Sequence, residues 1–155
     1  GPQENYWDRK TGAAVSVYSG PVEQLVHNYV RPQENGNRTD VRWAALTNDK
    51  GAGLLVVGMP LLNISVWPYT MEDLEQAEHT NELPRRDIIT LNIDYKQMGV
   101  GGDDSWGARP HEEYRLPAKP YSYSFRLRAL TGKEKSLSSL SKHVFPDMRT
   151  KKPKD

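Results

Sequence analysis

The sequence YSYSFRLR, at residues 121–128, alternates an aromatic or apolar residue with serine or arginine at every step. Side chains two residues apart share one face of a β-strand, so this alternation predicts a strand with one face in a core and the other in solvent. No other segment of the chain carries a clearer period of two. The fold is therefore expected to be built on β-strands.

Five further segments carry strand patterns. Residues 38–46 and 63–67 alternate polar and apolar side chains, as do residues 87–95. The run at 53–58 is continuously apolar, which predicts a strand buried on both faces. Residues 13–18 are rich in β-prone residues and end before a Gly-Pro pair. Together with residues 121–128, these segments predict six strands.

One short helix is expected after Thr70, which suits an N-cap, because Asp73 stands where a capping box needs an acid. Turns rich in Gly and Pro separate the strands, and the sequence shows no βαβ rhythm. Six strands with one short helix predict an all-β fold, namely an antiparallel β-sandwich.

Charge and composition divide the chain into two parts. Seven of the 21 Lys and Arg residues, but only three of the 20 Asp and Glu residues, lie in residues 133–155. Residues 1–130 are predicted to form one domain, and residues 131–155 a polar, basic C-terminal extension outside the core. A basic tail on a mildly acidic body does not resemble a nucleic-acid-binding surface, so no nucleic-acid partner is expected.

The sequence also limits the site chemistry and the location. The chain has no cysteine, which excludes disulfides and thiolate metal sites. Its four histidines are far apart in sequence, so neither a metal nor a cofactor is expected in this chain. No apolar run approaches the roughly 20 residues that span a bilayer, and no signal peptide is visible. No membrane partner is expected; the composition favours the cytoplasm and leaves the periplasm open.

The loop MGVGGDDSWG, at residues 98–107, is too polar and glycine-rich to be core. Trp106 could present a flat apolar face to a sugar ring, while Asp103 and Asp104 accept hydrogen bonds from its hydroxyls. These three residues are the predicted substrate-binding residues. Alternatively, Trp106 closes the end of the sandwich and the aspartates cap turn amides. Neighbouring side chains on one loop diverge, so the aspartates are not expected to be a catalytic pair.

Five motifs resemble the C-terminal, small-chain region (domain 5) of glycoside hydrolase family 2 β-galactosidases of the lacZ type. They occur here in the order found in that family and cover most of residues 1–130. In order along the chain, they read GPQENYWDRKTGA (1–13), YVRPQENGNRTDVRW (29–43), YTMEDLEQAEHTNELPRR (69–86), LNIDYKQMGVGGDDSWG (91–107) and LPAKPYSYSFRL (116–127).

The resemblance implies part of a supersandwich fold shared with galactose mutarotases. It implies that the domain packs against a TIM barrel holding both catalytic glutamates, which hydrolyse terminal β-galactosides such as lactose. Trp106 would then be a stacking platform for the glucose side of lactose, and the chain alone would be inactive, with no catalytic residue of its own. The full-length family enzymes commonly use Mg and Na ions.

The expected partners are a β-galactoside, the remainder of the β-galactosidase polypeptide and further copies of the chain. The family's full domain is longer than this chain, so unpaired sheet edges are expected to favour a homo-oligomer. Two alternatives stay open: a stand-alone carbohydrate-binding module, and a purely structural β-sandwich domain.

Overall fold

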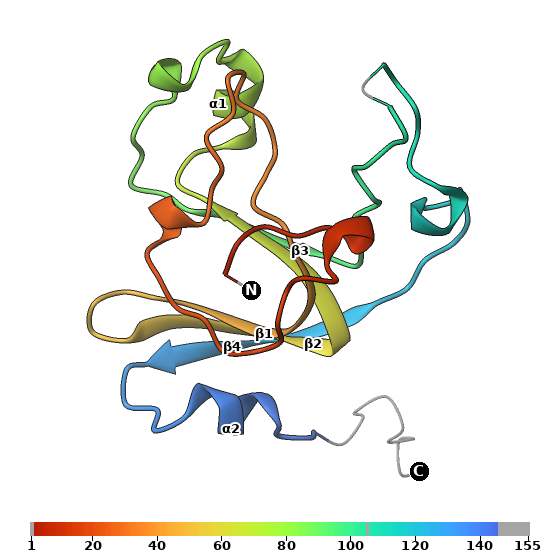
Figure 1. Ribbon diagram of the computed structural model, residues 1–155. Helices are drawn as coiled ribbons and strands as arrows, with labels where there is room; N and C mark the ends of the chain where they lie inside the picture. Colours follow the sequence, from red (N-terminus) through yellow and green to blue (C-terminus); the bar gives the residue numbers. More distant parts are fainter. Residues whose placement is uncertain (1, 105, 146–155) are drawn as a thin grey trace, which may run out of the picture.

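A single four-stranded antiparallel sheet forms the centre of the computed structural model, which describes residues 2–104 and 106–145 (Figure 1). The long strand β2 (Ala52–Trp67) pairs along one side with β1 (Arg38–Thr47). Along its other side it pairs first with β4 (Ser124–Thr131) and then with β3 (Thr90–Asp94). Every pairing is antiparallel, which confirms the predicted all-β antiparallel class.

Strand β2 is buried on both faces of the sheet, as its apolar run predicts. Leu55 and Val56 are 0% and 1% exposed, and as neighbours in a strand they point to opposite faces. On one face, Val56 clusters with the buried side chains of Leu62, Ile64 and Val66, against which Val22 and Leu25 pack. On the other face, Leu55 clusters with Val57 and Leu130.

The predicted strands at 53–58 and 63–67 are one continuous strand, because β1 runs beside both of them. Strands β1 and β3 lie where the periodicity places them. Strand β4 begins at Ser124, so Tyr121 and Tyr123 precede it rather than belong to it. Tyr123 still reaches the sheet, donating its hydroxyl to the Ile93 carbonyl oxygen at 3.0 Å.

The predicted strand at residues 13–18 is wrong. These residues pair with no strand, and the side chains of Val15 and Val17 are 75% and 66% exposed. A strand needs a neighbouring ladder to bond its backbone groups, and the described part of the chain places none beside this segment. Four strands are therefore observed where six are predicted.

Helix α1 (Met71–Gln76) confirms the predicted short helix and its capping box. The Thr70 hydroxyl accepts a hydrogen bond from the Asp73 backbone at 3.1 Å, and the Asp73 carboxylate accepts one from the Thr70 backbone at 2.8 Å. Leu74 packs against Trp67 and Tyr69 in a third buried cluster, which seats the helix over the end of β2.

A second short helix, α2 (Leu137–Ser141), is missing from the sequence-based prediction. It lies along the sheet at the bottom of Figure 1, and Leu137 and Leu140 pack on the face that carries Leu55. Arg126 of β4 donates hydrogen bonds to the carbonyl oxygens of Leu140 and His143, at 3.1 and 2.6 Å. The first part of the expected extension thus contacts the core, and its residues 146–155 lie outside the described residues.

No helix among the described residues is long and apolar enough to cross a membrane. Strands β1 and β4 flank β2, and within residues 2–104 and 106–145 neither has a second strand neighbour. Their outer edges are therefore not paired with a further strand in this part of the chain.

Acid is expected to loosen helix α1. Two hydrogen bonds from Arg86, at 2.6 and 2.7 Å, hold the pKa of Asp73 below its usual range, and bonds to Thr70 lower it further. Because its folded-state pKa is depressed, this carboxylate stabilises the fold above the unfolded pKa of about 3.9. That stabilisation is lost as the pH falls below this value. Amide exchange at Leu74, measured relative to the intrinsic exchange rate at each pH, should therefore accelerate below about pH 4. In Asp73→Asn that exchange should be fast already at neutral pH; an unchanged pH profile would contradict the assignment.

Candidate functional site: a tryptophan loop anchored by the N-terminal segment

Residues 98–107, called here the tryptophan loop, follow β3 and rise away from the sheet on the right of Figure 1. The Trp106 side chain is 93% exposed. Trp106 therefore does not close the end of the sheet, which was the alternative left open by the sequence. A large apolar ring is instead presented to solvent on a loop.

Asp104 fixes the turn that carries Trp106. Its Oδ1 accepts hydrogen bonds from the backbone N–H groups of Trp106 at 2.8 Å and Ala108 at 3.2 Å. An aspartate that bonds the amide two residues ahead forms an Asx-turn, which holds the local backbone in one shape. Asp104 thus contacts the backbone of the residue predicted to stack on sugar.

Asp103 points elsewhere, toward the returning arm of the loop. Its carboxylate oxygens lie 2.9 and 3.1 Å from Nε2 of His111. Both side chains remain well exposed, 80% for Asp103 and 61% for His111. The two aspartates therefore contact different partners, and their carboxylates do not act on one shared group.

The glycines of the loop serve close approach rather than a left-handed backbone. A Cβ on Gly102 would lie 2.3 Å from the Ala108 carbonyl oxygen, so the two arms of the loop touch there. A Cβ on Gly99 or Gly101 would lie 2.8 Å from the Asp8 carboxylate. Among the glycines of this loop, only Gly107 has a positive φ, at 119°.

The N-terminal motif lies directly against this loop. Asp8, in the 3-10 helix η1 (Trp7–Arg9), accepts hydrogen bonds from the backbone N–H groups of Val100 at 3.2 Å and Gly101 at 2.6 Å. Sequence reasoning identified both segments but missed Asp8, because nothing in the spacing of residues more than ninety positions apart reveals a contact.

Two further contacts join helix η1 to the base of the loop. The Trp7 ring meets the Tyr114 ring edge-on, with centroids 6.0 Å apart, and Lys96 Nζ lies 3.6 Å from the centre of the Trp7 ring. Tyr114 ends the 3-10 helix η4 (Glu112–Tyr114), and its carbonyl oxygen accepts the Gly99 N–H at 2.8 Å. Helix η1, the loop and η4 therefore pack as one unit.

A buried polar network ties the motif at residues 29–43 to the N-terminal segment. Glu4 accepts hydrogen bonds from the Gly36 N–H at 2.8 Å and the Tyr29 hydroxyl at 2.9 Å. Asn5 and Asn37, 7% and 4% exposed, exchange two 2.8 Å bonds through their backbone and side-chain groups. Because buried polar groups need partners, these residues specify how the segments dock.

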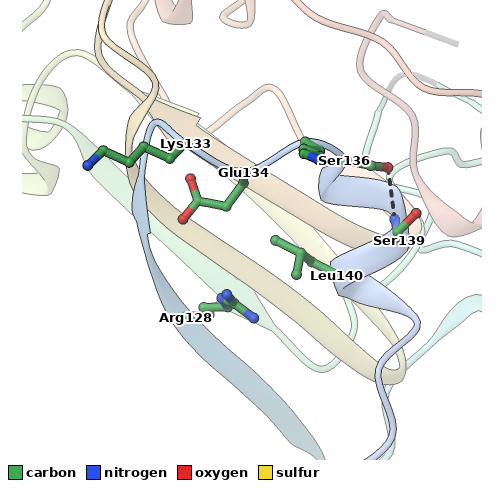
Figure 2. A pocket seen from close by; sticks show the side chains of 7 residues that line it. Arg128, Lys133, Glu134, Ser136, Ser139 and Leu140 are labelled. Atoms are coloured by element: carbon green, nitrogen blue, oxygen red, sulfur yellow. Dashed lines mark hydrogen bonds between the residues drawn. The ribbon is translucent and has the colours of Figure 1, made fainter.

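A hollow of about 440 Å³ lies between β4 and α2, on the opposite side of the molecule from the tryptophan loop (Figure 1). Figure 2 shows the side chains that line it. Its polar groups are largely engaged locally: Glu134 accepts the N–H groups of Thr131 and Gly132, and Ser136 accepts that of Ser139. The hollow lies where the chain turns from the end of β4 into α2. Its lining residues are Arg128, Lys133, Glu134, Lys135, Ser136, Ser139 and Leu140.

Within residues 2–104 and 106–145, no group of three or more His, Asp or Glu side chains could hold a metal ion. His79 and His111 each face a single carboxylate, that of Glu82 and Asp103 respectively.

The fold and site define an antiparallel β-domain that presents a tryptophan on a loop anchored by a distant segment. Residues 1–127 match the sequence model of one family, the beta galactosidase small chain. The chain belongs to this β-galactosidase small-chain family.

Similar proteins share this region. The β-galactosidase of Priestia megaterium is 50% identical over 131 residues, which are 84% of this chain and 13% of that protein. That of Halalkalibacterium halodurans is 47% identical over 119 residues, which are 76% of this chain and 12% of that protein. That of Lactobacillus delbrueckii subsp. bulgaricus is 41% identical over 119 residues, which are 77% of this chain and 12% of that protein. The chain thus spans only 12–13% of these relatives and corresponds to the small C-terminal region of a large β-galactosidase.

Proposed function

We propose that this chain works as the small-chain domain of a glycoside hydrolase family 2 β-galactosidase. The whole enzyme would hydrolyse terminal non-reducing β-galactosides such as lactose, with its catalytic carboxylates on a barrel elsewhere in the polypeptide. The proposal is supported by the relatives named β-galactosidase, whose identity to this chain reaches 50%. The chain by itself would be inactive.

Within that enzyme, Trp106 supplies a stacking platform for the glucose side of lactose. One observation carries this role: the indole is 93% exposed on a loop whose backbone is fixed on both sides by carboxylates. An aromatic face held in place loses little conformational entropy when a sugar packs on it. Asp104 shapes the turn, and the exposed Asp103 can share its carboxylate between His111 and a sugar hydroxyl.

The remainder of the β-galactosidase polypeptide is the proposed partner of this domain. A row of half-exposed aromatic rings favours such packing: Tyr95 contacts Tyr121 and Tyr123 at 5.5 and 5.9 Å, and Tyr123 contacts Phe125 at 5.9 Å. We propose that these rings and the outer edges of β1 and β4 pack against the rest of a supersandwich. The assembled enzyme would then form a homo-oligomer.

A stand-alone carbohydrate-binding module is the second candidate, favoured by the same exposed indole. It would bind lactose through Trp106 without any other part of a β-galactosidase. The two candidates differ in where sugar affinity resides, in the chain alone or in the assembled enzyme.

A chimaeric enzyme tests the proposal. The aligned region of the Priestia megaterium β-galactosidase is replaced by this chain, and lactose hydrolysis is compared with that of a deletion lacking the region. The chimaera should turn over lactose, while the deletion and the 155-residue chain alone should not. A folded but inactive chimaera, or turnover by the isolated chain, would contradict the proposal; lactose binding by the isolated chain would favour the module.

A further inference from the structure

We infer that Asp8 is a positioning residue for Trp106, holding the tryptophan loop against helix η1 through the backbone of Val100 and Gly101. The geometry stands by itself, whereas its consequence for sugar affinity rests on the proposed function. Asp8 lies 98 positions before Trp106 in the sequence and belongs to a different segment.

The contact is specific to a carboxylate at this position. Asp8 Oδ2 lies 2.6 Å from the Gly101 nitrogen and Oδ1 lies 3.2 Å from the Val100 nitrogen, so each oxygen accepts one of two successive amides. Hydrogen bonds to an ionised acceptor are shorter and stronger than those to a neutral one. A neutral side chain of the same size would keep only one good acceptor.

The glycines around Asp8 form the seat for its carboxylate. A Cβ on Gly101 would lie 2.8 Å from Asp8 Oδ2, and one on Gly99 would lie 2.8 Å from Asp8 and 2.9 Å from Tyr114 Cβ. Contacts of that length do not occur for real side chains, so glycine at 99 and 101 is what lets the carboxylate reach the backbone. The contact therefore needs both the glycines at 99 and 101 and the carboxylate of Asp8.

Helix η1 can position the loop because it is itself tied to the sheet. On one side of it, the Asn5 N–H donates to the Asn37 carbonyl oxygen at 2.8 Å, beside the start of β1. On the other side, Lys10 forms an ion pair with Asp40 of β1. Asp8 therefore links the loop to β1 through a segment fixed at both ends.

Two further contacts fix the backbone of the loop after Gly101: one joins its two arms, and the other forms the Asp104 turn. Gly102 meets the Ala108 carbonyl oxygen, and Asp104 bonds the amide of Trp106. Each step involves a backbone group of the loop, so none depends on a contact between two flexible side chains. Releasing Asp8 should therefore enlarge the motion of the indole while leaving the sheet intact.

The test uses the full ¹⁵N-labelled chain and three variants. Asp8→Ala removes both acceptors, Asp8→Asn keeps one, and Asp49→Ala makes the same charge change in the β1–β2 hairpin, far from the loop in Figure 1. Amide hydrogen exchange at Gly101 and the order parameter of the Trp106 indole N–H are measured, with the buried Val56 amide reporting global unfolding.

In Asp8→Ala, Gly101 exchange should rise about tenfold or more, as expected for losing a bond to a charged acceptor. Trp106 order should fall, with Val56 exchange no faster than in Asp49→Ala. Asp8→Asn should be intermediate, whereas a merely space-filling role would predict full rescue by this side chain of the same size. Unchanged Gly101 exchange and Trp106 order, or changes equal to those at Val56, would overturn the inference.

The same variants in the chimaera separate the two proposals. If Asp8→Ala raises the KM for lactose severalfold with kcat for a galactoside of small aglycone unchanged, both stand. If Gly101 and Trp106 are loosened but lactose KM is unchanged in both Asp8→Ala and Trp106→Ala, Asp8 still positions the loop and the sugar-binding role of Trp106 fails.

Discussion

Trp67→Ala should lower the free energy of unfolding by about 3–5 kcal/mol, as expected for truncating a buried tryptophan. Trp67 is 1% exposed and packs with Tyr69 and Leu74 under helix α1. Its Nε1 donates a 2.7 Å hydrogen bond to the Asn35 carbonyl oxygen. The substitution leaves both a cavity and a buried acceptor without its donor. Urea unfolding followed by far-UV circular dichroism measures the loss.

Trp67→Phe is the matched control, since it keeps an aromatic ring but removes the indole N–H. It should cost less than Trp67→Ala, and its own loss should include the roughly 1–3 kcal/mol of an orphaned carbonyl, which the two variants share. Equal losses in the two variants would assign the whole effect to the hydrogen bond. A loss below about 1 kcal/mol in Trp67→Ala, typical of surface sites, would contradict the buried position of Trp67.

Trp106→Ala should leave the stability nearly unchanged but weaken the binding of lactose. Because its side chain is 93% exposed, unfolding free energy should change by no more than about 0.5 kcal/mol. In the chimaeric enzyme, however, KM for lactose should rise about tenfold, which corresponds to about 1.4 kcal/mol of lost stacking. The KM for methyl β-galactoside, whose aglycone is too small to reach the platform, should change much less.

Trp106→Phe provides the control for that substitution, because a smaller aromatic ring keeps part of the stacking surface. Its KM for lactose should lie between those of the parent chimaera and Trp106→Ala. A uniform rise of KM for lactose and methyl β-galactoside would show that Trp106 shapes the whole pocket rather than a platform for the aglycone.

Hydrophobic periodicity predicts the positions of β1, β3 and much of β4, each of which pairs with β2. It is wrong about the predicted core face of β4, where Phe125 and Leu127 are 38% and 51% exposed. It fails at residues 13–18, where Val15 and Val17 alternate correctly but have no ladder to join. Periodicity reports which side chains could share a face; it cannot report whether a neighbouring strand is present. It also splits β2 in two, although β1 pairs with β2 on both sides of the interval, with a register shift between Val41 and Trp43.

Helix α2 escapes prediction for a related reason. Its five residues hold only two apolar side chains, Leu137 and Leu140, among serines, so no helical period is visible. Tertiary contacts with Leu55 and Val57 supply the stability that such a short helix lacks in isolation.

The glycine-rich, acidic surroundings of Trp106 leave two positions open for it, exposed on a loop or closing the end of the sandwich, and its 93% exposure decides between them. The sequence leaves the roles of the aspartates unresolved, because loop side chains can reach several amides. The structure distinguishes them: Asp104 bonds its own turn and Asp103 faces His111. The contact of Asp8 with Gly101 depends on the path of the chain between them, which local patterns do not contain.

A structure of the chimaeric enzyme bound to an unreactive lactose analogue would test the platform most directly. The indole face of Trp106 should lie against the glucose ring, with carbon atoms about 4 Å apart, the ordinary contact distance of apolar groups. Asp8 should still accept the Gly101 amide in that complex. A glucose ring bound in the pocket with Trp106 turned away, and no atom of the indole in contact with it, would contradict the proposed role.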